Sequence, residues 1–187
     1  MVSIENRTSL LHPYIEKSLL QALKDCKEQN LSVKPFETLR LPSRQNALFV
    51  QKKTKAKAGE SNHQFGLAVD LVFVNRNKLP TWKGDWNAVG KIMMKHGFAW
   101  GRYFSSFPED CHFEMTFDIP KKDLREAWAK HGVAGCFKLV DAKLEKQREA
   151  SKKLPLPVIT KESHVSIVEI VQRLLSIVSK FRKKKNG

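Results

Sequence analysis

A carboxylate stands in the middle of an apolar run. Residues 68–74 read AVDLVFV, a pattern typical of a strand in which Asp70 shares one face with Val72 and Val74. A buried carboxylate is costly unless a cation pairs with it or a metal binds it. This strand must therefore fold beside groups that can neutralise Asp70, which constrains the fold more than any other feature of the chain.

Two histidines are candidates for that role. His63 precedes Asp70 by seven residues, and His112 opens an alternating run in which Glu114 and Thr116 share its face. Two imidazoles and one carboxylate can bind zinc and leave a fourth position for water. A histidine beside a strand is more often a surface or hydrogen-bonded core residue, so the spacing alone leaves a metal site and an ordinary structural role equally balanced.

The remaining elements follow from hydrophobic periodicity and from breaker residues. Ser43 is a candidate N-cap, Pro35 favours a sheet edge, and Gly132 is a natural helix stop. Residues 52–61 are polar and basic and predict a loop. Helices are expected over residues 10–30, 44–51, 85–96 and 120–132, and strands over residues 33–39, 68–74 and 112–117.

Composition excludes several classes of protein. The 187 residues carry 34 Lys and Arg against 19 Asp and Glu, a formal net charge of +15. No apolar run reaches the roughly 18 residues of a membrane-spanning helix, and three widely spaced cysteines exclude a disulfide framework and a Cys-only zinc site. The positive charge implies a polyanionic neighbour, such as nucleic acid, an anionic membrane or an anionic cell wall. No nucleic-acid motif accompanies it, so no specific nucleic acid is expected.

The composition changes after Gly135, which predicts a domain over residues 1–135 and a basic tail over residues 136–187. The tail holds 13 Lys and Arg against 5 Asp and Glu. It contains a proline-stiffened linker and then an amphipathic helix that ends in a basic cluster. Three roles stay open for that helix: packing on the domain, binding an anionic wall or membrane surface, and self-association.

One constellation resembles a known family. A serine, two small residues, a histidine and an aspartate form S-x-H-x-x-G-x-A-x-D, and a carboxylate-x-x-His pair follows; these are Ser61, His63, Gly66, Ala68 and Asp70, with Glu109 and His112. The pattern resembles the zinc peptidases that cleave bacterial peptidoglycan stems. They include D-alanyl-D-alanine carboxypeptidases and phage L-alanyl-D-glutamate endopeptidases (endolysins), and they share a fold with the hedgehog signalling domain. Residues 36–49 add to a resemblance that covers roughly residues 10–130.

The resemblance implies an α+β fold, with a small, mainly antiparallel sheet packed against helices, and one bound Zn²⁺. It implies that residues 1–135 form the catalytic domain. Its metal ligands would be His63, Asp70 and His112. Its other site residues would be Glu109 as catalytic base, Arg40 beside the substrate carbonyl or a substrate carboxylate, and Ser61 and Gln45 in support.

Two departures from the family pattern lie beside the second histidine. Asp110 adjoins Glu109 and competes with it for the role of base, and Cys111 stands where proline or tryptophan is more usual.

The function implied is zinc-dependent hydrolysis of the peptidoglycan stem peptide, with an L-alanyl-D-glutamate endopeptidase of endolysin type favoured. The alternatives are a D-alanyl-D-alanine carboxypeptidase of the same family and a catalytically silent binding module that keeps the zinc. The first residues lack a basic start followed by an apolar run. We therefore expect synthesis in the cytoplasm without a signal peptide, holin-type release, and action at the cell wall.

Overall fold

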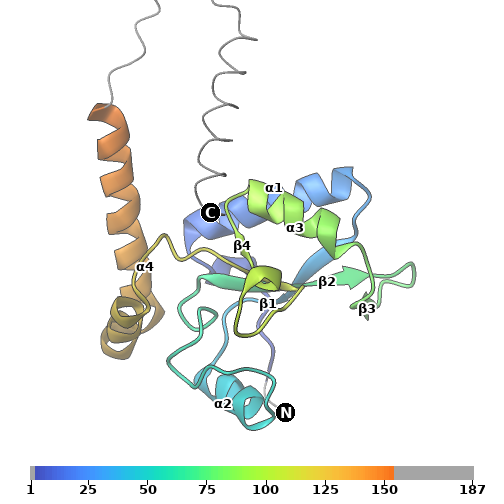
Figure 1. Ribbon diagram of the computed structural model, residues 1–187, viewed down its shortest axis with the longest axis horizontal. Coiled ribbons are helices and arrows are strands. Elements are labelled where there is room, and N and C mark those ends of the chain that lie inside the picture. The colour runs from blue at the N-terminus through green and yellow to red at the C-terminus, as the bar shows by residue number, and fades with distance from the viewer. Residues whose placement is uncertain (1–2, 154–187) are drawn as a thin grey trace, which may run out of the picture. The chain divides into compact units, whose positions relative to one another are not determined.

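The computed structural model describes residues 3–153, which form helices around a small sheet (Figure 1). Two of its elements are short 3₁₀ helices, η1 and η2. In chain order the elements are η1 (Thr8–Leu10), α1 (Pro13–Glu28), β1 (Val33–Glu37), α2 (Pro42–Val50), β2 (Ala68–Val74), β3 (Pro80–Thr81), α3 (Trp86–Lys95), β4 (Ala99–Trp100), η2 (Gly101–Tyr103), β5 (His112–Glu114) and α4 (Lys121–Lys153).

The sheet is antiparallel at every pairing, in the order β1-β2-β5-β4. The short β3 pairs with the end of β2 that β5 leaves free. The strand that carries Asp70 is therefore covered along both edges, and β1, with Pro35, lies at the edge of the sheet as predicted. The register sets Asp70 of β2 opposite His112 of β5.

The two faces of β2 have different surroundings. Val69, Leu71 and Phe73 belong to a continuous apolar core with α1 and α3, which lie together on one side of the sheet (Figure 1). Because side chains alternate along a strand, Asp70 points to the other face. On that side lie α2 and the loops around it. Packing of the apolar face thus fixes where the carboxylate points.

Capping and spacing explain the two core helices. In α1 the ring of His12 accepts a hydrogen bond from the Tyr14 N–H, and a buried stripe runs along one face of the helix. In α3 the Asp85 carboxylate caps the Ala88 N–H at 3.0 Å. The helix ends at Lys95, and Gly97 follows with a positive φ of 92°. The stripe of α1 consists of Ile15, Leu19, Ala22 and Cys26.

The last helix extends beyond its predicted end. At Gly132 the backbone leaves helical geometry, with φ 62° and ψ −154°, but helix resumes and runs to Lys153. It resumes because Cys136 and Val140 pack into the same core as Leu124. The predicted domain boundary after residue 135 therefore falls inside α4, and the compact unit of the structure reaches Gln147. The predicted amphipathic helix and nearly all of the predicted linker lie outside the described residues.

Two further expectations differ from the structure in detail. Helix α2 begins at Pro42 after Leu41, without a side-chain cap, so the predicted cap Ser43 lies inside the helix. Proline supplies the start because its fixed φ suits the first helical position. The strand predicted over residues 112–117 ends at Glu114, and Phe117 and Asp118 both adopt φ of 54°, which turns the chain toward α4. The predicted α+β class with a small antiparallel sheet is confirmed.

Candidate metal centre

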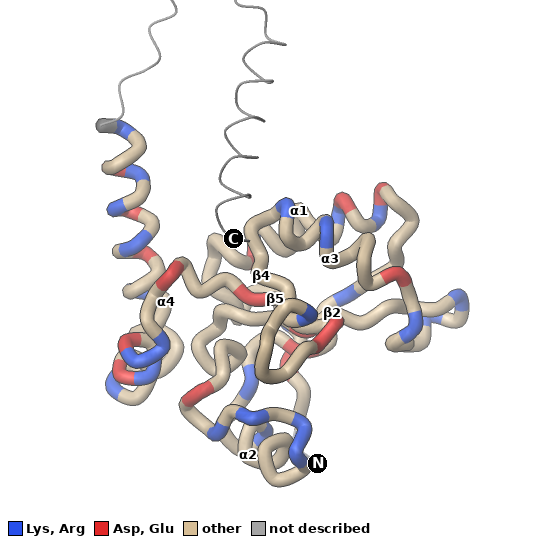
Figure 2. The backbone as a smooth tube through the Cα atoms, viewed as in Figure 1, with Lys and Arg blue, Asp and Glu red and all other residues tan. Residues whose placement is uncertain are grey.

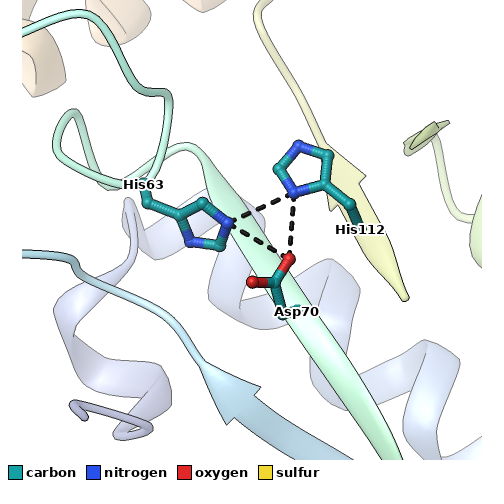
Figure 3. Close-up of side chains that lie close together, drawn as sticks. All are labelled: His63, Asp70 and His112. Carbon is teal, nitrogen blue, oxygen red and sulfur yellow. Dashed lines mark hydrogen bonds and ion pairs between the residues drawn. The ribbon is translucent and has the colours of Figure 1, made fainter. Parts of the chain in front are cut away.

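Three donor atoms from three parts of the chain meet on the polar face of the sheet (Figure 3). His63 comes from the loop before β2, Asp70 from β2 and His112 from the start of β5. His63 Nε2 lies 3.2 Å from Asp70 Oδ1 and 3.2 Å from His112 Nδ1, and His112 Nδ1 lies 3.0 Å from Asp70 Oδ1. The structure thus brings together the three residues that the sequence singled out.

Each imidazole is oriented by a bond on its far side. His63 Nδ1 lies 2.8 Å from the carbonyl oxygen of Thr38, which can only accept, so this nitrogen carries the proton. His112 Nε2 lies 3.0 Å from a carboxylate oxygen of Glu114, which leaves Nδ1 as the inward nitrogen. In the neutral rings both inward nitrogens present a lone pair toward Asp70. Three acceptor atoms so close together repel one another unless a cation or a proton lies among them.

The donor set suits a zinc ion. A tetrahedral ion that binds its ligands at about 2.0–2.1 Å separates neighbouring ligand atoms by about 3.3 Å. The three observed separations, 3.0 to 3.2 Å, are close to that value. Two imidazole nitrogens and one carboxylate oxygen also match the ligand types of catalytic zinc sites, which keep a fourth position open. The residues present therefore fit the metal that the sequence implied.

The Asp70 carboxylate has a second partner in Arg40. The Arg40 guanidinium is buried and donates to Asp70 Oδ2 at 3.0 Å, to Glu37 Oε2 through two nitrogens and to Gln45 Oε1. Gln45 in turn donates to the carbonyl of Ala56 at 2.7 Å, which ties α2 to the following loop. The guanidinium thus makes four hydrogen bonds within the chain and also lines the cavity, and its predicted place beside a substrate group stays a prediction.

Electrostatics differ sharply among the ionisable groups of the site. Burial alone would raise the pKa of Asp70, but the two histidines outweigh it and hold that pKa well below its usual value. Burial lowers the pKa of His112, but hydrogen bonds from its ring to Asp70 and Glu114 outweigh burial and raise the pKa to about 9. Without a metal, His112 is therefore protonated at neutral pH, and the added proton lies among the three donor atoms.

A cavity of about 930 Å³ opens beside the three donors. Glu109 lines it, and its pKa is raised, first by burial and then by the negative charge of Asp70. Asp110 differs from its neighbour. Its carboxylate lies 2.6 Å from Arg102 Nε, and this hydrogen bond lowers its pKa. Of the two adjacent carboxylates, Glu109 faces the cavity and has the environment of a proton carrier.

The wall of the cavity on the α2 side is basic. Figure 2 shows Lys and Arg gathered around α2, chiefly on the loop that follows it. Lys55 donates to the carbonyl of Ser106 across the cavity and so connects this loop to the segment before Glu109. Ser61, predicted to support the site, is buried in the wall. The basic residues that line the cavity here are Arg44, Lys52, Lys53 and Lys55.

The sequence did not single out several residues of this network. Glu37, Asn62 and Lys121 have no pattern that points to the site, because folding alone brings them there from separate elements. Glu114 did have a signal in the sequence, since it is charged and lies two residues after His112 on the same face of the strand. Cys111 lines the cavity, where burial raises the pKa of its thiol and keeps it protonated. It thus replaces the usual proline or tryptophan without adding a thiolate ligand.

Comparison with known proteins agrees with this geometry. A family model described as D-alanyl-D-alanine carboxypeptidase matches residues 54–115, which include all three donors and Glu109. The peptidoglycan L-alanyl-D-glutamate endopeptidase CwlK of Bacillus subtilis (strain 168) is 28% identical over 122 aligned positions, which cover 56% of this chain and 73% of the relative.

Over residues 54–115 the chain is similar to this family of carboxypeptidases, and over a longer span it is similar to the CwlK endopeptidase. These similarities support a peptidase. The crystal structure of the L-Ala D-Glu endopeptidase ChiX of Serratia marcescens has the same fold, with a TM-score of 0.51 and 20% identity over 59% of this chain and 84% of that one. The family resemblance inferred from the sequence is thereby confirmed. Among residues 3–153, no helix has the length and apolarity needed to cross a membrane.

Proposed function

We propose that this chain is a zinc-dependent peptidase of the peptidoglycan stem, and that it cleaves the L-alanyl-D-glutamate bond. The observation that carries the proposal is the convergence of His63, Asp70 and His112 beside a cavity that Glu109 also lines. The CwlK relative supports the choice of substrate and of bond.

In this proposal His63, Asp70 and His112 hold one Zn²⁺. When bound, the ion supplies Lewis acidity that polarises a carbonyl group and lowers the pKa of water toward about 7. The chain supports this arrangement from outside the cluster, because Thr38 fixes the ring of His63 and Arg40 fixes the carboxylate of Asp70. Arg40 is thus assigned to positioning Asp70, and its contact with a substrate carbonyl or carboxylate stays a prediction.

Glu109 is the proton carrier. Its carboxylate takes a proton from the attacking water and then gives that proton to the nitrogen of the leaving amine. Burial and the charge of Asp70 raise its pKa, which brings the carboxyl group closer to the working pH and so makes both transfers easier. Asp110 does not line the cavity and is hydrogen-bonded to Arg102, which favours Glu109 for this role. Ser61 lines the wall of the cavity, and Gln45 supports that wall through its hydrogen bonds with Arg40 and with the carbonyl of Ala56.

The charge of the cavity supports an acidic substrate. A peptide that contains glutamate carries a carboxylate besides the group in the scissile bond, and Lys52, Lys53 and Lys55 line the opposing wall. Chain charge also supports action at an anionic cell wall, since the whole sequence carries a net +15. Contact of the basic tail with an anionic wall or membrane belongs to the same proposal.

A D-alanyl-D-alanine carboxypeptidase is the second candidate, because the matching family model carries that description. Digestion of purified peptidoglycan, followed by mass spectrometry of the products, separates the two. The proposed endopeptidase releases peptides that begin with D-glutamate and leaves L-alanine on the glycan. A carboxypeptidase releases only free D-alanine.

Metal dependence is tested in the same digestion. A chelator should abolish release, and added Zn²⁺ should restore it. Digestion that continues unchanged in the chelator would refute the zinc peptidase, and zinc binding without any product would favour the silent binding module.

A further inference from the structure

One chain of hydrogen bonds leads from His112 along the wall of the cavity and ends at Lys121 of α4. His112 Nε2 lies 3.0 Å from Glu114 Oε2, and the same oxygen accepts from Asn62 Nδ2 at 2.7 Å. Asn62 Oδ1 accepts from Lys121 Nζ at 2.6 Å. Each link has one possible direction, because an ammonium only donates and a carboxylate only accepts. The orientation of the Asn62 amide follows from its two neighbours.

The carboxylate in this chain has a rigid base. Glu114 pairs with Ala68 of β2 and with Ala99 of β4, so its backbone is held on both sides within the sheet. Asn62 is buried, and its carbonyl oxygen accepts from Phe65 and Leu67 N–H groups. The fold therefore holds the backbones of both Glu114 and Asn62, and His112 meets an acceptor that a paired strand carries.

We propose that Glu114, held by Asn62 and Lys121, is a positioning residue that fixes His112 with Nε2 protonated and Nδ1 directed at the metal site. This inference rests on the metal site of the proposed function. Thr38 and Arg40 serve the other two donors, and Glu114 completes the set for the third. Its negative charge also makes the ring a stronger electron donor. Loss of such an outer partner typically weakens metal binding by about 10- to 100-fold.

The test measures binding of Zn²⁺ alone, by competition with a chromogenic chelator, on the full chain. Glu114→Ala should bind Zn²⁺ roughly 10- to 100-fold more weakly than the parent. Glu114→Gln keeps an acceptor oxygen of the same shape without the charge, so it should lose less. Glu126→Ala is the matched control, since Glu126 is exposed on α4 and, within the described part of the chain, its ion pair is with Lys122. It should bind Zn²⁺ as the parent does.

A second readout separates positioning from general stability. Imidazole ¹⁵N spectra of the zinc-loaded protein report which ring nitrogen carries the proton. The parent and Glu114→Gln should show a protected Nε2–H on His112, and Glu114→Ala should lose that protection. Affinity within twofold of the parent in Glu114→Ala would overturn the inference, as would an unchanged Nε2–H signal in that variant.

Folding of the alanine variant does not limit the test. If Glu114→Ala does not fold, Glu114→Gln and Asn62→Ala replace it, because Asn62→Ala frees the carboxylate from its second donor. Both should bind Zn²⁺ more weakly than Glu126→Ala, and equal affinity in all three would overturn the inference. Because no peptide is present, these results do not depend on whether the chain cleaves peptidoglycan.

Discussion

Two adjacent carboxylates, Glu109 and Asp110, have opposite surroundings, and this difference can be measured. Glu109 lines the cavity with a raised pKa, while Asp110 is paired with Arg102. Glu109→Gln should lower the turnover of a stem peptide by roughly 10²–10⁴-fold, because proton transfer is removed. Its Zn²⁺ content should stay that of the parent. Steady-state kinetics and metal analysis on the same samples check both expectations.

Asp110→Asn is the matched control for Glu109, since it removes a neighbouring charge of the same sign. Its turnover should remain within a few-fold of the parent. If instead Asp110→Asn loses turnover and Glu109→Gln keeps it, the proton carrier is the other carboxylate.

Arg40 offers a second prediction at the scale of single residues. Its guanidinium is buried between Glu37 and Asp70, so removing it takes away the cation that the two buried carboxylates share. Arg40→Met should lower the free energy of unfolding of the metal-free protein by about 3–5 kcal/mol. Arg44 binds the other oxygen of Glu37 at 3.1 Å from a more exposed position, and Arg44→Met should cost about 1 kcal/mol. Urea unfolding of both variants would contradict this account if the two losses were equal.

At the scale of elements, α1 and α4 are joined through a buried histidine. His12 caps α1, its Nε2 lies 3.1 Å from Asp141 of α4, and its ring contacts Phe137 edge to face. Burial lowers the pKa of His12, and Asp141 opposes that effect only in part. The unfolded chain therefore binds a proton at this residue first, near pH 6.5, so the free energy of unfolding falls as the pH drops below that value.

His12→Asn tests this coupling, because asparagine keeps a capping oxygen and does not titrate. The parent should lose more unfolding free energy than His12→Asn between pH 7.5 and pH 5.5, as chemical denaturation at the two pH values would show. Equal losses in the two proteins would mean that His12 takes up its proton equally well in the folded state.

Elements with a clear local pattern were predicted from the sequence, and elements without one were missed. The short apolar run around Asp70 predicts β2, because its length and its β-branched and aromatic residues are typical of a buried strand. The two-residue strands β3 and β4 are too short to have a period. Gly132 predicts a break in helical geometry, and the backbone does leave that geometry there. The helix nevertheless resumes, because Cys136 and Val140 pack into the core.

The candidate site divides in the same way. His63, Asp70 and His112 carry a signal in the sequence, since a carboxylate inside an apolar strand needs a partner and two histidines lie at motif spacing from it. Their outer partners, such as Asn62 and Lys121, are ordinary polar residues that only the folded chain brings together. For those residues, the information lies in long-range packing rather than in spacing.

The whole molecule separates into a part that holds the site and a part that adds charge. The three donors, Glu109 and the cavity all belong to the compact unit that ends at Gln147. Residues 154–187 add seven Lys and Arg against two Asp and Glu. A chain shortened to residues 1–153 should therefore bind Zn²⁺ and cleave short stem peptides as the full chain does. Its retention on intact anionic cell walls should be weaker.

Salt decides whether that difference in retention is electrostatic. Exposed charges are screened over about 10 Å at 0.1 M salt and about 3 Å at 1 M, so retention of the full chain should fall steeply across this range. Retention of the shortened chain should fall less, because it has fewer charges to screen. Co-sedimentation with purified walls measures both chains at each salt concentration. Equal retention of the two chains at low salt would show that the charge of residues 154–187 does not contribute to wall binding. The unit that contains the site would then be the part that binds the wall.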